Sequence, residues 1–406
     1  MPFGREMLPH WDLDPSITYL NHGTVGVTPR RVLARQQEIR DEIERQPSKF
    51  LLRDLSGLVG LPRGEPTLLR QAASIVAEFV NADASDVVFV DNATTGVNAV
   101  LRSFPLAAGD EILLTDHNYG ATWRVAAFVA RERGAHVKTV AVPYPTFGGM
   151  ALVGAVAAAI TPRTRIAVID HITSESALVF PLATIASTCR ARGVPVLVDG
   201  AHGPGVLPLD IPSLGVEWYT ANLHKWAHAP RSCGFLWARR DRQANLHPPV
   251  ISWGLDQGFI AEFDWVGTRD PSPWLAAPEG IALLKELGEA TVWRYNHDLA
   301  WRGAQRLSEC WHTRLGFGEA DIGFMATVPL PDALGSSAEQ AAALRDALLF
   351  EDRIEVHVHA SHGRLWARIS AQIYVQLSDI DRLAAAVAAK LGDGGRGGHG
   401  DTGETD

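Results

Sequence analysis

The chain has few cysteines and no long apolar or basic segment, and each absence limits what the protein can be. Its three cysteines, Cys189, Cys233 and Cys310, are far apart and form no C-x-x-C pair, which argues against a disulfide framework or a cysteine-based metal site. No apolar run reaches the length of a membrane span, and the first residues have no signal-peptide core. We therefore expect a cytoplasmic protein with no membrane partner.

The charge balance is acidic, with 37 Lys and Arg residues against 46 Asp and Glu residues and a net charge of −9. Because basic residues form no cluster, nucleic acid is not an expected partner. Hydrophobic residues make up 46% of the chain and charged residues 20%, as in ordinary globular proteins. A length of 406 residues is too great for one small core and predicts a large and a small domain.

The middle of the chain alternates short β-rich runs with helical patterns. Several of the runs are continuously apolar, as in strands whose two faces are both covered by helices, so the pattern predicts an α/β domain with a mostly parallel sheet. The predicted strands are 87–90, 111–115, 137–142, 166–170 and 194–199, and the predicted helices between them are 95–103 and 122–133.

Beyond Trp265 the pattern changes to that of a smaller α+β domain. It predicts a long helix over 278–306, strands over 323–328, 354–359 and 365–370, and a closing helix over 377–390. We expect an N-terminal arm at 1–20, a large domain at 21–265, a small domain at 266–391 and a disordered Gly- and Asp-rich tail at 392–406.

One pair of residues gives the strongest chemical signal. Asp199 ends an apolar strand pattern, and Lys225 lies in Asn222-Leu223-His224-Lys225-Trp226, beyond the next crossover. A lysine amine can hold the aldehyde of pyridoxal phosphate (PLP) as a Schiff base, while a carboxylate keeps the pyridine nitrogen protonated. Each residue alone has an ordinary alternative, since Asp199 could cap a helix and Lys225 could be a solvated loop lysine.

Other candidates surround this pair in the sequence. The loop before the helix at 95–103 contains Thr94 and Thr95 and could bind a phosphate, although Asn92 or Thr94 could equally be a plain N-cap. Asn222 and His224 are further candidates for phosphate contacts, and His202 could touch the phenolic oxygen of the ring.

Three more side chains are candidates for holding the cofactor ring or the substrate. Tyr119, with His117 as the alternate, could stack on the ring, or either could be packing. Arg368 suits a substrate carboxylate, and Arg53 is a weaker candidate. The alternative for each arginine is a salt-bridged surface residue.

His357, His359 and His362 raise the question of a metal site. The first two share a strand face, but no cysteine accompanies them, and a solvated strand face alternates in the same way. We favour substrate-pocket or surface histidines and expect no metal.

Together these segments resemble the class V aminotransferase family of fold-type I PLP enzymes, and within it the isopenicillin N epimerase-like branch. The resemblance covers about residues 19–390. It implies a mostly parallel, seven-stranded-type sheet between helices, a smaller C-terminal α+β domain, and a homodimer with shared active sites. The segments that carry it are Asn21-His22-Gly23-Thr24-Val25-Gly26, Phe50-Leu51-Leu52-Arg53, Asn92-Ala93-Thr94-Thr95, Val198-Asp199-Gly200-Ala201-His202, His224-Lys225-Trp226, Gly267-Thr268-Arg269-Asp270 and Arg368-Ile369-Ser370.

The resemblance also implies a role for each matched position. Catalysis is assigned to Lys225, Asp199, His202 and Tyr119. Cofactor binding is assigned to Thr94, Thr95, Tyr119, Ser174, Asp199, His202, Asn222, His224, Lys225 and, reaching the phosphate of a neighbouring subunit, Thr268. Substrate binding is assigned to Asn21, His22, Arg53 and Arg368.

One departure from the family is informative. Related cysteine desulfurases carry a nucleophilic cysteine on a loop before the Arg-x-Ser segment, whereas residues 357–363 contain none, so persulfide formation is disfavoured. We expect Lys225 to remove the α-proton of an amino acid, with epimerisation and β-elimination by a C–S lyase as near equals and transamination third. A non-catalytic binding protein is a further alternative, which the intact Lys225 and Asp199 argue against.

Overall fold

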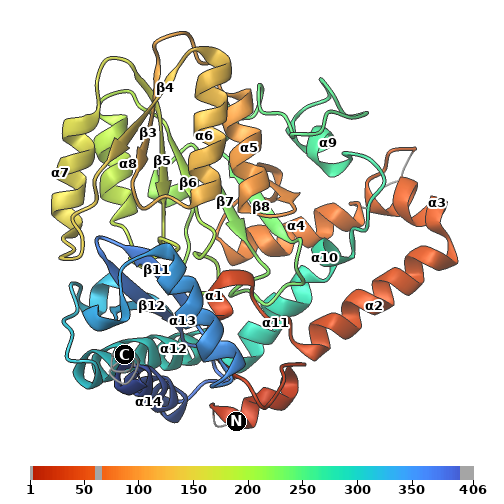
Figure 1. Ribbon diagram of the computed structural model, residues 1–406. Coiled ribbons are helices and arrows are strands. Elements are labelled where there is room, and N and C mark those ends of the chain that lie inside the picture. Colours follow the sequence, from red (N-terminus) through yellow and green to blue (C-terminus); the bar gives the residue numbers. More distant parts are fainter. Residues whose placement is uncertain (1–2, 60–65, 394–406) are drawn as a thin grey trace, which may run out of the picture.

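A seven-stranded sheet forms the centre of the larger part of the molecule (Figure 1). The computed structural model describes residues 3–59 and 66–393. In the strand order β2-β8-β7-β6-β5-β3-β4, β8 runs antiparallel to both neighbours and the other pairings are parallel. The strands are β2 (Val87–Val90), β3 (Glu111–Thr115), β4 (His136–Val140), β5 (Thr164–Asp170), β6 (Val196–Asp199), β7 (Trp218–Asn222) and β8 (Gly234–Ala238).

Side chains that alternate along these strands enter two different apolar cores. Ile112 and Leu114 of β3 pack on the side of α5 and α6, whereas Leu113 between them packs on the side of α7 and α8. Helices on both faces therefore explain the continuous apolar runs and confirm the predicted α/β class. The helices are α5 (Ala93–Ser103), α6 (Gly120–Arg133), α7 (Gly149–Ala159) and α8 (Leu182–Arg190).

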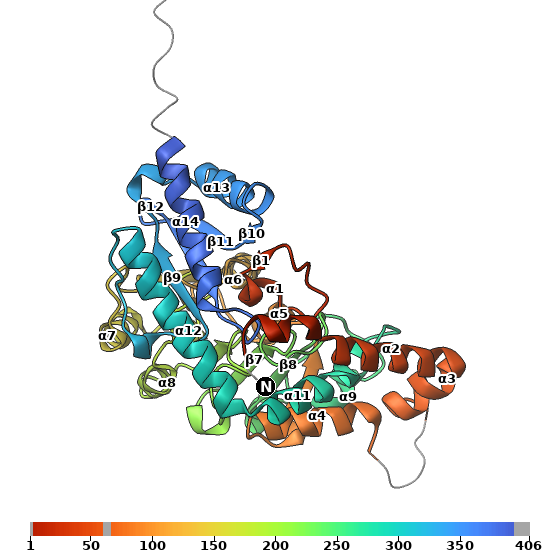
Figure 2. The same cartoon turned by 90° about the horizontal axis from the view of Figure 1, so that it is seen from below.

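The C-terminal part is built on a smaller antiparallel sheet with the order β11-β12-β9. Helices α12 and α14 lie side by side (Figure 2), and α12 packs against β9 and β12 of this sheet. A separate pair, β1 with β10, joins the N-terminal segment to this part. The elements are β1 (Thr18–Tyr19), β9 (Met325–Pro329), β10 (Ile354–Glu355), β11 (His357–Ser361), β12 (Arg364–Ser370), α12 (Glu289–Cys310), α13 (Ala338–Phe350) and α14 (Leu377–Asp393).

The remaining helices come from the N-terminal segment and from the connection between the two sheets. Helices α2 and α3 extend away from the sheets at the right of Figure 1. These helices are α1 (His22–Val25), α2 (Arg30–Arg45), α3 (Pro47–Lys49), the π-helical turn η2 (Phe50–Leu55), α4 (Leu68–Phe79), α9 (Phe259–Asp264), α10 (Ser272–Leu275) and α11 (Ala277–Leu287). Short 3-10 turns are η1 (Arg5–His10), η3 (Ala84–Asp86), η4 (Pro212–Leu214), η5 (Arg240–Arg242), η6 (Glu319–Asp321) and η7 (Asp332–Leu334).

Two predictions for the C-terminal part were wrong. The single helix over 278–306 is two helices, α11 and α12, because Gly288 between them has a φ of 81° that no helix continues. The single strand over 354–359 is β10 and β11, which pair with different partners. Helix α14 extends to Asp393, and residues 394–406 of the predicted tail lie outside the described residues. The domain limits stay predictions.

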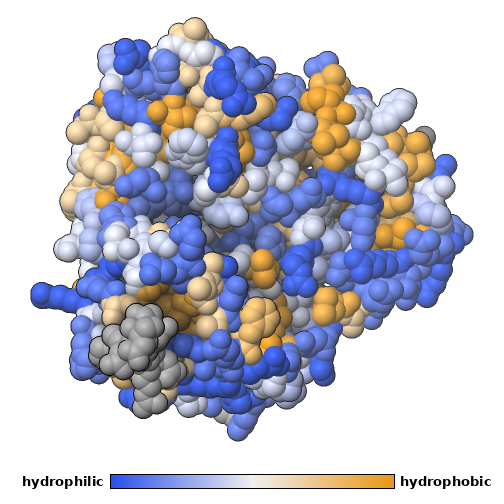
Figure 3. Space-filling model, in the orientation of Figure 1, coloured by the Kyte–Doolittle hydropathy of each residue, from blue (hydrophilic) through white to orange (hydrophobic). Residues whose placement is uncertain are grey.

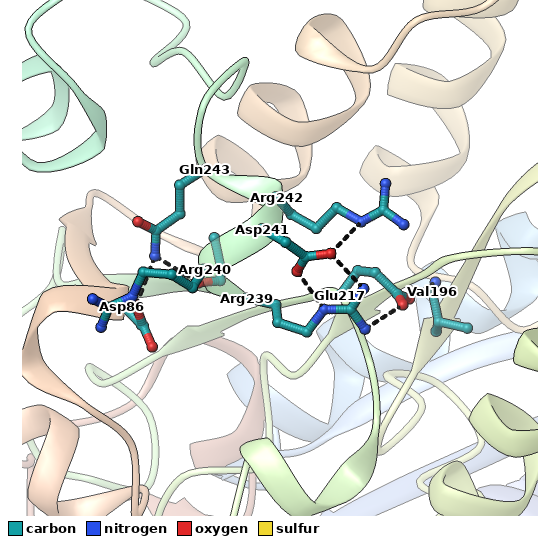
Figure 4. Close-up of polar contacts among 9 residues, drawn as sticks. Asp86, Val196, Glu217, Arg239, Arg240, Asp241, Arg242 and Gln243 are labelled. Atoms are coloured by element: carbon teal, nitrogen blue, oxygen red, sulfur yellow. Dashed lines mark hydrogen bonds and ion pairs between the residues drawn. The ribbon is translucent and has the colours of Figure 1, made fainter.

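A charged network fixes the edge of the large sheet that lies away from the carboxyl ends of β6 and β7 (Figure 4). Glu217 is 6% exposed and accepts the N–H of Val196 at 2.7 Å and a guanidinium N–H of Arg239 at 2.8 Å. Arg239 also donates to Asp241. The network ties the end of the antiparallel strand β8 to the starts of β6 and β7.

Replacing Glu217 by Ala should destabilise the fold by about 1–3 kcal/mol, because the buried N–H of Val196 and the guanidinium of Arg239 lose an acceptor. The matched control is Asp241→Ala, which removes a 58%-exposed carboxylate from the same arginine and should cost about 0–1 kcal/mol. The midpoint of urea-induced unfolding measures both. Equal shifts for the two variants would contradict the structural role of Glu217.

Candidate active site

Strands β5, β6 and β7 end at one edge of the large sheet, and a cavity of about 210 Å³ lies there. The carboxyl ends of parallel strands are the usual ligand-binding edge of an α/β sheet. The cavity brings together most of the side chains that the sequence selected. Among those lining it are Thr94, Tyr119, Ser174, Asp199, His202, Asn222, His224 and Lys225.

Asp199, at the end of β6, is 3% exposed and held by two donors. The hydroxyl of Thr122 donates to Oδ2 at 2.8 Å, and the N–H of Ala201 donates to Oδ1 at 3.2 Å. Burial raises the pKa of Asp199 above its usual value, while these donors and the nearby Lys225 amine oppose the rise. A cationic ring nitrogen beside this carboxyl would stabilise its ionised form.

A hydrogen bond from the buried His22 ring restrains the backbone at Lys225. Nε2 of His22 donates to the Lys225 backbone carbonyl at 2.9 Å, because a carbonyl oxygen can only accept. In a neutral ring Nδ1 of His22 then has no proton, so it accepts a hydrogen bond from the Tyr374 hydroxyl at 2.9 Å. His22 is fully buried and does not line the cavity. His22 therefore contacts the Lys225 backbone outside the cavity, and its assignment to substrate binding stays a prediction.

The Lys225 amine faces a single ring nitrogen. Its Nζ lies 3.2 Å from Nε2 of His202, and the indole N–H of Trp226 donates to Nδ1 of the same ring at 3.2 Å. A neutral ring that accepts at Nδ1 carries its proton on Nε2, so it donates toward an amine that has a free lone pair. Burial, with the Arg368 charge, lowers the pKa of Lys225 to about 7, and burial keeps the pKa of His202 well below its usual value.

The amino end of α5 closes another side of the cavity. Asn92 caps the helix by accepting the Thr95 N–H at 2.9 Å, and Asn222 accepts the Ala93 N–H at 2.9 Å. A Cβ at Gly96 would lie 2.0 Å from Thr220 Oγ1, so only glycine lets α5 approach the sheet this closely. Thr94 lines the cavity at the helix start, where a phosphate is stabilised by N–H groups and the helix dipole.

Two predicted phosphate contacts differ in how well they are placed. The N–H of Thr95 is used by the Asn92 cap, and Thr95 does not line the cavity. His224 lines it and donates from Nδ1 to the Cys233 carbonyl at 3.0 Å. Burial lowers the pKa of His224 to about 4, so a neutral ring would offer a lone pair, and a phosphate dianion beside it would favour the protonated ring.

The structure distinguishes Tyr119 from its alternate, His117. Tyr119 lines the cavity at the start of α6 and is 47% exposed. His117 lies outside the cavity lining, 2.7 Å from the Ser176 hydroxyl and 5.0 Å between ring centroids from Tyr144. Burial lowers the pKa of His117 to about 4. The position of Tyr119 fits a ring-stacking role better.

Arg368 is a buried arginine, 1% exposed, rather than a surface one. It donates to the Ser174 carbonyl, to Thr24 Oγ1 at 2.6 Å and to Asn21 Oδ1 at 3.2 Å. No carboxylate of the described residues forms an ion pair with it, and burial lowers its pKa to about 10. A buried guanidinium in this state would gain from a substrate carboxylate.

The remaining candidates lie apart from the cavity. Arg53 is exposed on the extended π-helical turn, and Thr268 follows α9 and is not among the lining residues. The rings of His357 and His359 stack at 5.3 Å. Within residues 3–59 and 66–393, no group of three metal-binding side chains comes together.

Sequence reasoning missed one buried acid in the cavity lining. Asp170 ends β5 and is 2% exposed. The available signal was its place at the end of a predicted strand, the same place as Asp199 in the next strand. Thr122 was missed as well, because a threonine inside a helix carries no signal of its contact with a residue so distant in sequence.

Comparison with known proteins places the chain in a family. Residues 65–383 match the family Aminotransferase class-V. A probable L-cysteine desulfhydrase of Arabidopsis thaliana is 32% identical, with 94% of this chain and 84% of the relative covered. An isopenicillin N epimerase of Streptomyces clavuligerus is also 32% identical, with 94% and 96% covered.

Solved structures agree on the fold. The cystine C–S lyase C-DES in complex with cysteine persulfide superposes with a TM-score of 0.76 at 23% identity, over 92% of this chain and 98% of the other. The cysteine desulfurase CsdA of Escherichia coli gives 0.73 at 18% identity, over 97% and 99%.

The chain belongs to the class V aminotransferase family and is a PLP-dependent enzyme with the fold-type I architecture. The site fits this cofactor on its own chemistry. It offers a buried amine, a buried carboxyl group at a strand end and a helix amino terminus around one cavity.

The lowered pKa of Lys225 predicts how the protein without cofactor takes up PLP. Only the neutral amine attacks an aldehyde, so the rate of cofactor capture should rise as the pH increases to about 7 and level off above it. The growth of visible absorbance after mixing, followed from acidic to alkaline pH, measures this rate. A rate that climbs steadily to the pH range of an ordinary lysine would contradict an amine held mainly neutral by burial.

Proposed function

We propose that the protein removes the α-proton of a small amino-acid substrate, with Lys225 as the base and Asp199 as the partner of the cofactor's ring nitrogen. Bound PLP supplies an electron sink for the pair left at the α-carbon. The observation that carries this proposal is the buried Lys225 amine, whose pKa near 7 suits proton transfer, in the same cavity as Asp199.

The other site residues take supporting roles in this proposal. Arg368, oriented by Asn21 and Thr24, binds the substrate carboxylate. Tyr119 stacks on the cofactor ring. His202 and Ser174 contact its phenolic oxygen, and the phosphate is held at the start of α5 by Thr94, Asn222 and His224.

Loss of a β-substituent, as in a C–S lyase, is the outcome that the site supports best. Such a reaction needs one base at the α-carbon, and Lys225 is the one amine among the described lining residues. Both nitrogens of His202 and one of His224 are already hydrogen bonded. Relatives that cover most of the chain are named L-cysteine desulfhydrases.

Epimerisation is the second candidate, because Tyr119 offers a second acid. Its hydroxyl makes no hydrogen bond with the described residues, and its side chain lines the same cavity as Lys225. A phenol on the opposite face of the substrate from Lys225 could return the proton with inversion. Relatives of equal identity are named isopenicillin N epimerases.

Incubation with cysteine and other amino acids in deuterium oxide separates the two outcomes. Elimination should release pyruvate, ammonia and the sulfur leaving group, whereas epimerisation should give both enantiomers with deuterium at the α-carbon. We expect Lys225→Ala to abolish either reaction, with a loss of several orders of magnitude, and Tyr119→Phe to reduce epimerisation alone. Neither product from a broad panel of amino acids would contradict α-proton removal.

We further propose a homodimer in which Thr268 reaches the phosphate of the neighbouring site. The loop before α9 exposes Val250, Ile251 and Trp253, the last at 76%, and Figure 3 shows apolar side chains gathered there. Thr268 follows on the same connection between the sheets. An apolar patch of this kind is typical of a protein interface.

Trp253→Glu should shift the protein from dimer to monomer and weaken cofactor binding, because a charge in the interface is not solvated and the Thr268 contact is lost with the partner. Phe350→Glu, at a 73%-exposed position on α13, is the matched control and should change neither property. Sedimentation velocity and cofactor titration measure both. A monomeric wild-type protein would contradict the shared site.

Other partner and location assignments rest on the sequence. No helix of the described residues combines the length and apolarity that a membrane crossing requires. A cytoplasmic location and the lack of nucleic-acid partners stay predictions.

A further inference from the structure

The cavity contains two buried carboxyl groups, and only one of them has an assigned role. Asp170 of β5 and Asp199 of β6 are direct register partners at the carboxyl ends of neighbouring parallel strands. Neighbouring strands lie about 4.8 Å apart, so side chains that are paired in register stand next to each other. Both groups line the cavity and are 2% and 3% exposed.

The two carboxyl groups accept hydrogen bonds from different residues of the segment that leads into α6. Asp199 accepts a hydrogen bond from the hydroxyl of Thr122, in the first turn of α6. Asp170 accepts from the Asn118 side-chain amide at 2.7 Å and from the backbone N–H of Tyr119. The side-chain oxygen of Asn118, Oδ1, accepts the backbone N–H of Thr115 at 2.6 Å. This contact orients the side-chain amide so that its NH₂ group faces Asp170.

These contacts connect Asp170 to the aromatic side chain at the cavity. Tyr119 is the N-cap residue of α6, and its side chain makes no capping hydrogen bond. Its backbone N–H, bonded to Asp170, therefore restrains where the phenol ring leaves the main chain. The ring itself is 47% exposed and has little packing of its own to hold it.

The charges around the pair favour different protonation states for its two members. Desolvation and then the charge of Asp199 raise the pKa of Asp170 well above its usual value, while Asn118, the Tyr119 N–H and the Lys225 amine only partly oppose this. The pKa of Asp199 is raised by burial and lowered by Thr122, Ala201 and Lys225. Two adjacent buried carboxyl groups do not both ionise at low cost.

We propose that Asp170 is a positioning residue that holds the Asn118–Tyr119 turn against the cavity as an uncharged carboxylic acid, so that Asp199 alone carries the negative charge beneath the cofactor ring. This inference rests on the proposed stacking role of Tyr119. A charged carboxylate at position 170 would compete with Asp199 for the ring nitrogen of the cofactor. An uncharged Asp170 does not compete, so both acids can line the same cavity.

The test compares Asp170→Asn, which keeps the shape and has no charge, with Asp170→Ala, which removes the acceptor. Both are studied as the holoenzyme. In Asp170→Asn, the visible absorption band of the cofactor linked to Lys225 should titrate at the wild-type midpoint. Removal of a charged neighbour would instead move that midpoint by about 1–3 pH units, and such a shift would overturn the uncharged state of Asp170.

In Asp170→Ala, the induced circular dichroism of the cofactor band should weaken and the cofactor dissociation constant should rise on the order of tenfold, the effect of losing one strong hydrogen bond. A double-mutant cycle with Tyr119→Ala separates positioning from general damage. In the Tyr119→Ala background, Asp170→Ala should have little further effect on cofactor affinity. Fully additive losses would overturn the positioning role.

Two controls keep this test separate from that of the proposed function. The urea midpoint of Asp170→Asn should match that of the wild type, which shows that the fold is intact. If the wild-type protein itself gives no visible cofactor band, the proposed function fails. If the wild-type band is present and Asp170→Asn shifts its titration, only the role of Asp170 fails.

Discussion

Burial of the Lys225 amine is the constraint on which the rest of the site depends. In water this amine would be charged at neutral pH and useless as a nucleophile, but burial and the charge of Arg368 lower its pKa to about 7. His22 holds its backbone from behind, and His202 presents an N–H to its lone pair. The carboxyl groups of Asp199 and Asp170 oppose this lowering of the pKa, but burial outweighs them and favours the neutral form that both cofactor capture and proton removal require.

The fold brings these groups together from segments that are far apart in the chain. Strands β5, β6 and β7 end side by side, so Asp170, Asp199 and the connection that carries Lys225 meet at one edge. The N-terminal residues around Asn21 and the C-terminal strand β12 add Arg368 to the same region. Strand β12 of the small sheet thereby places Arg368 against Ser174 and Thr24, two residues that line the cavity at the edge of the large sheet.

The sequence predicted the fold class and most of the cavity lining. The ends of strands in an α/β pattern can be recognised from the neighbouring residues alone, as at Asp199. It missed β7 and β8, the strands on either side of the segment that contains Lys225. It gave no signal of the contact between His22 and Lys225 or of that between Asp170 and Asn118, because both join residues that are far apart in the chain. The helix break at Gly288 depends on one backbone angle, which periodicity does not reveal.

The central claim is a covalent bond between the cofactor aldehyde and the side chain at position 225. Reduction of the holoenzyme with borohydride makes such a bond permanent, and peptide mapping by mass spectrometry then locates it. We expect a single pyridoxyl group, on the peptide that contains Lys225. Modification of another lysine, or no modification of a protein that has been saturated with cofactor, would contradict it.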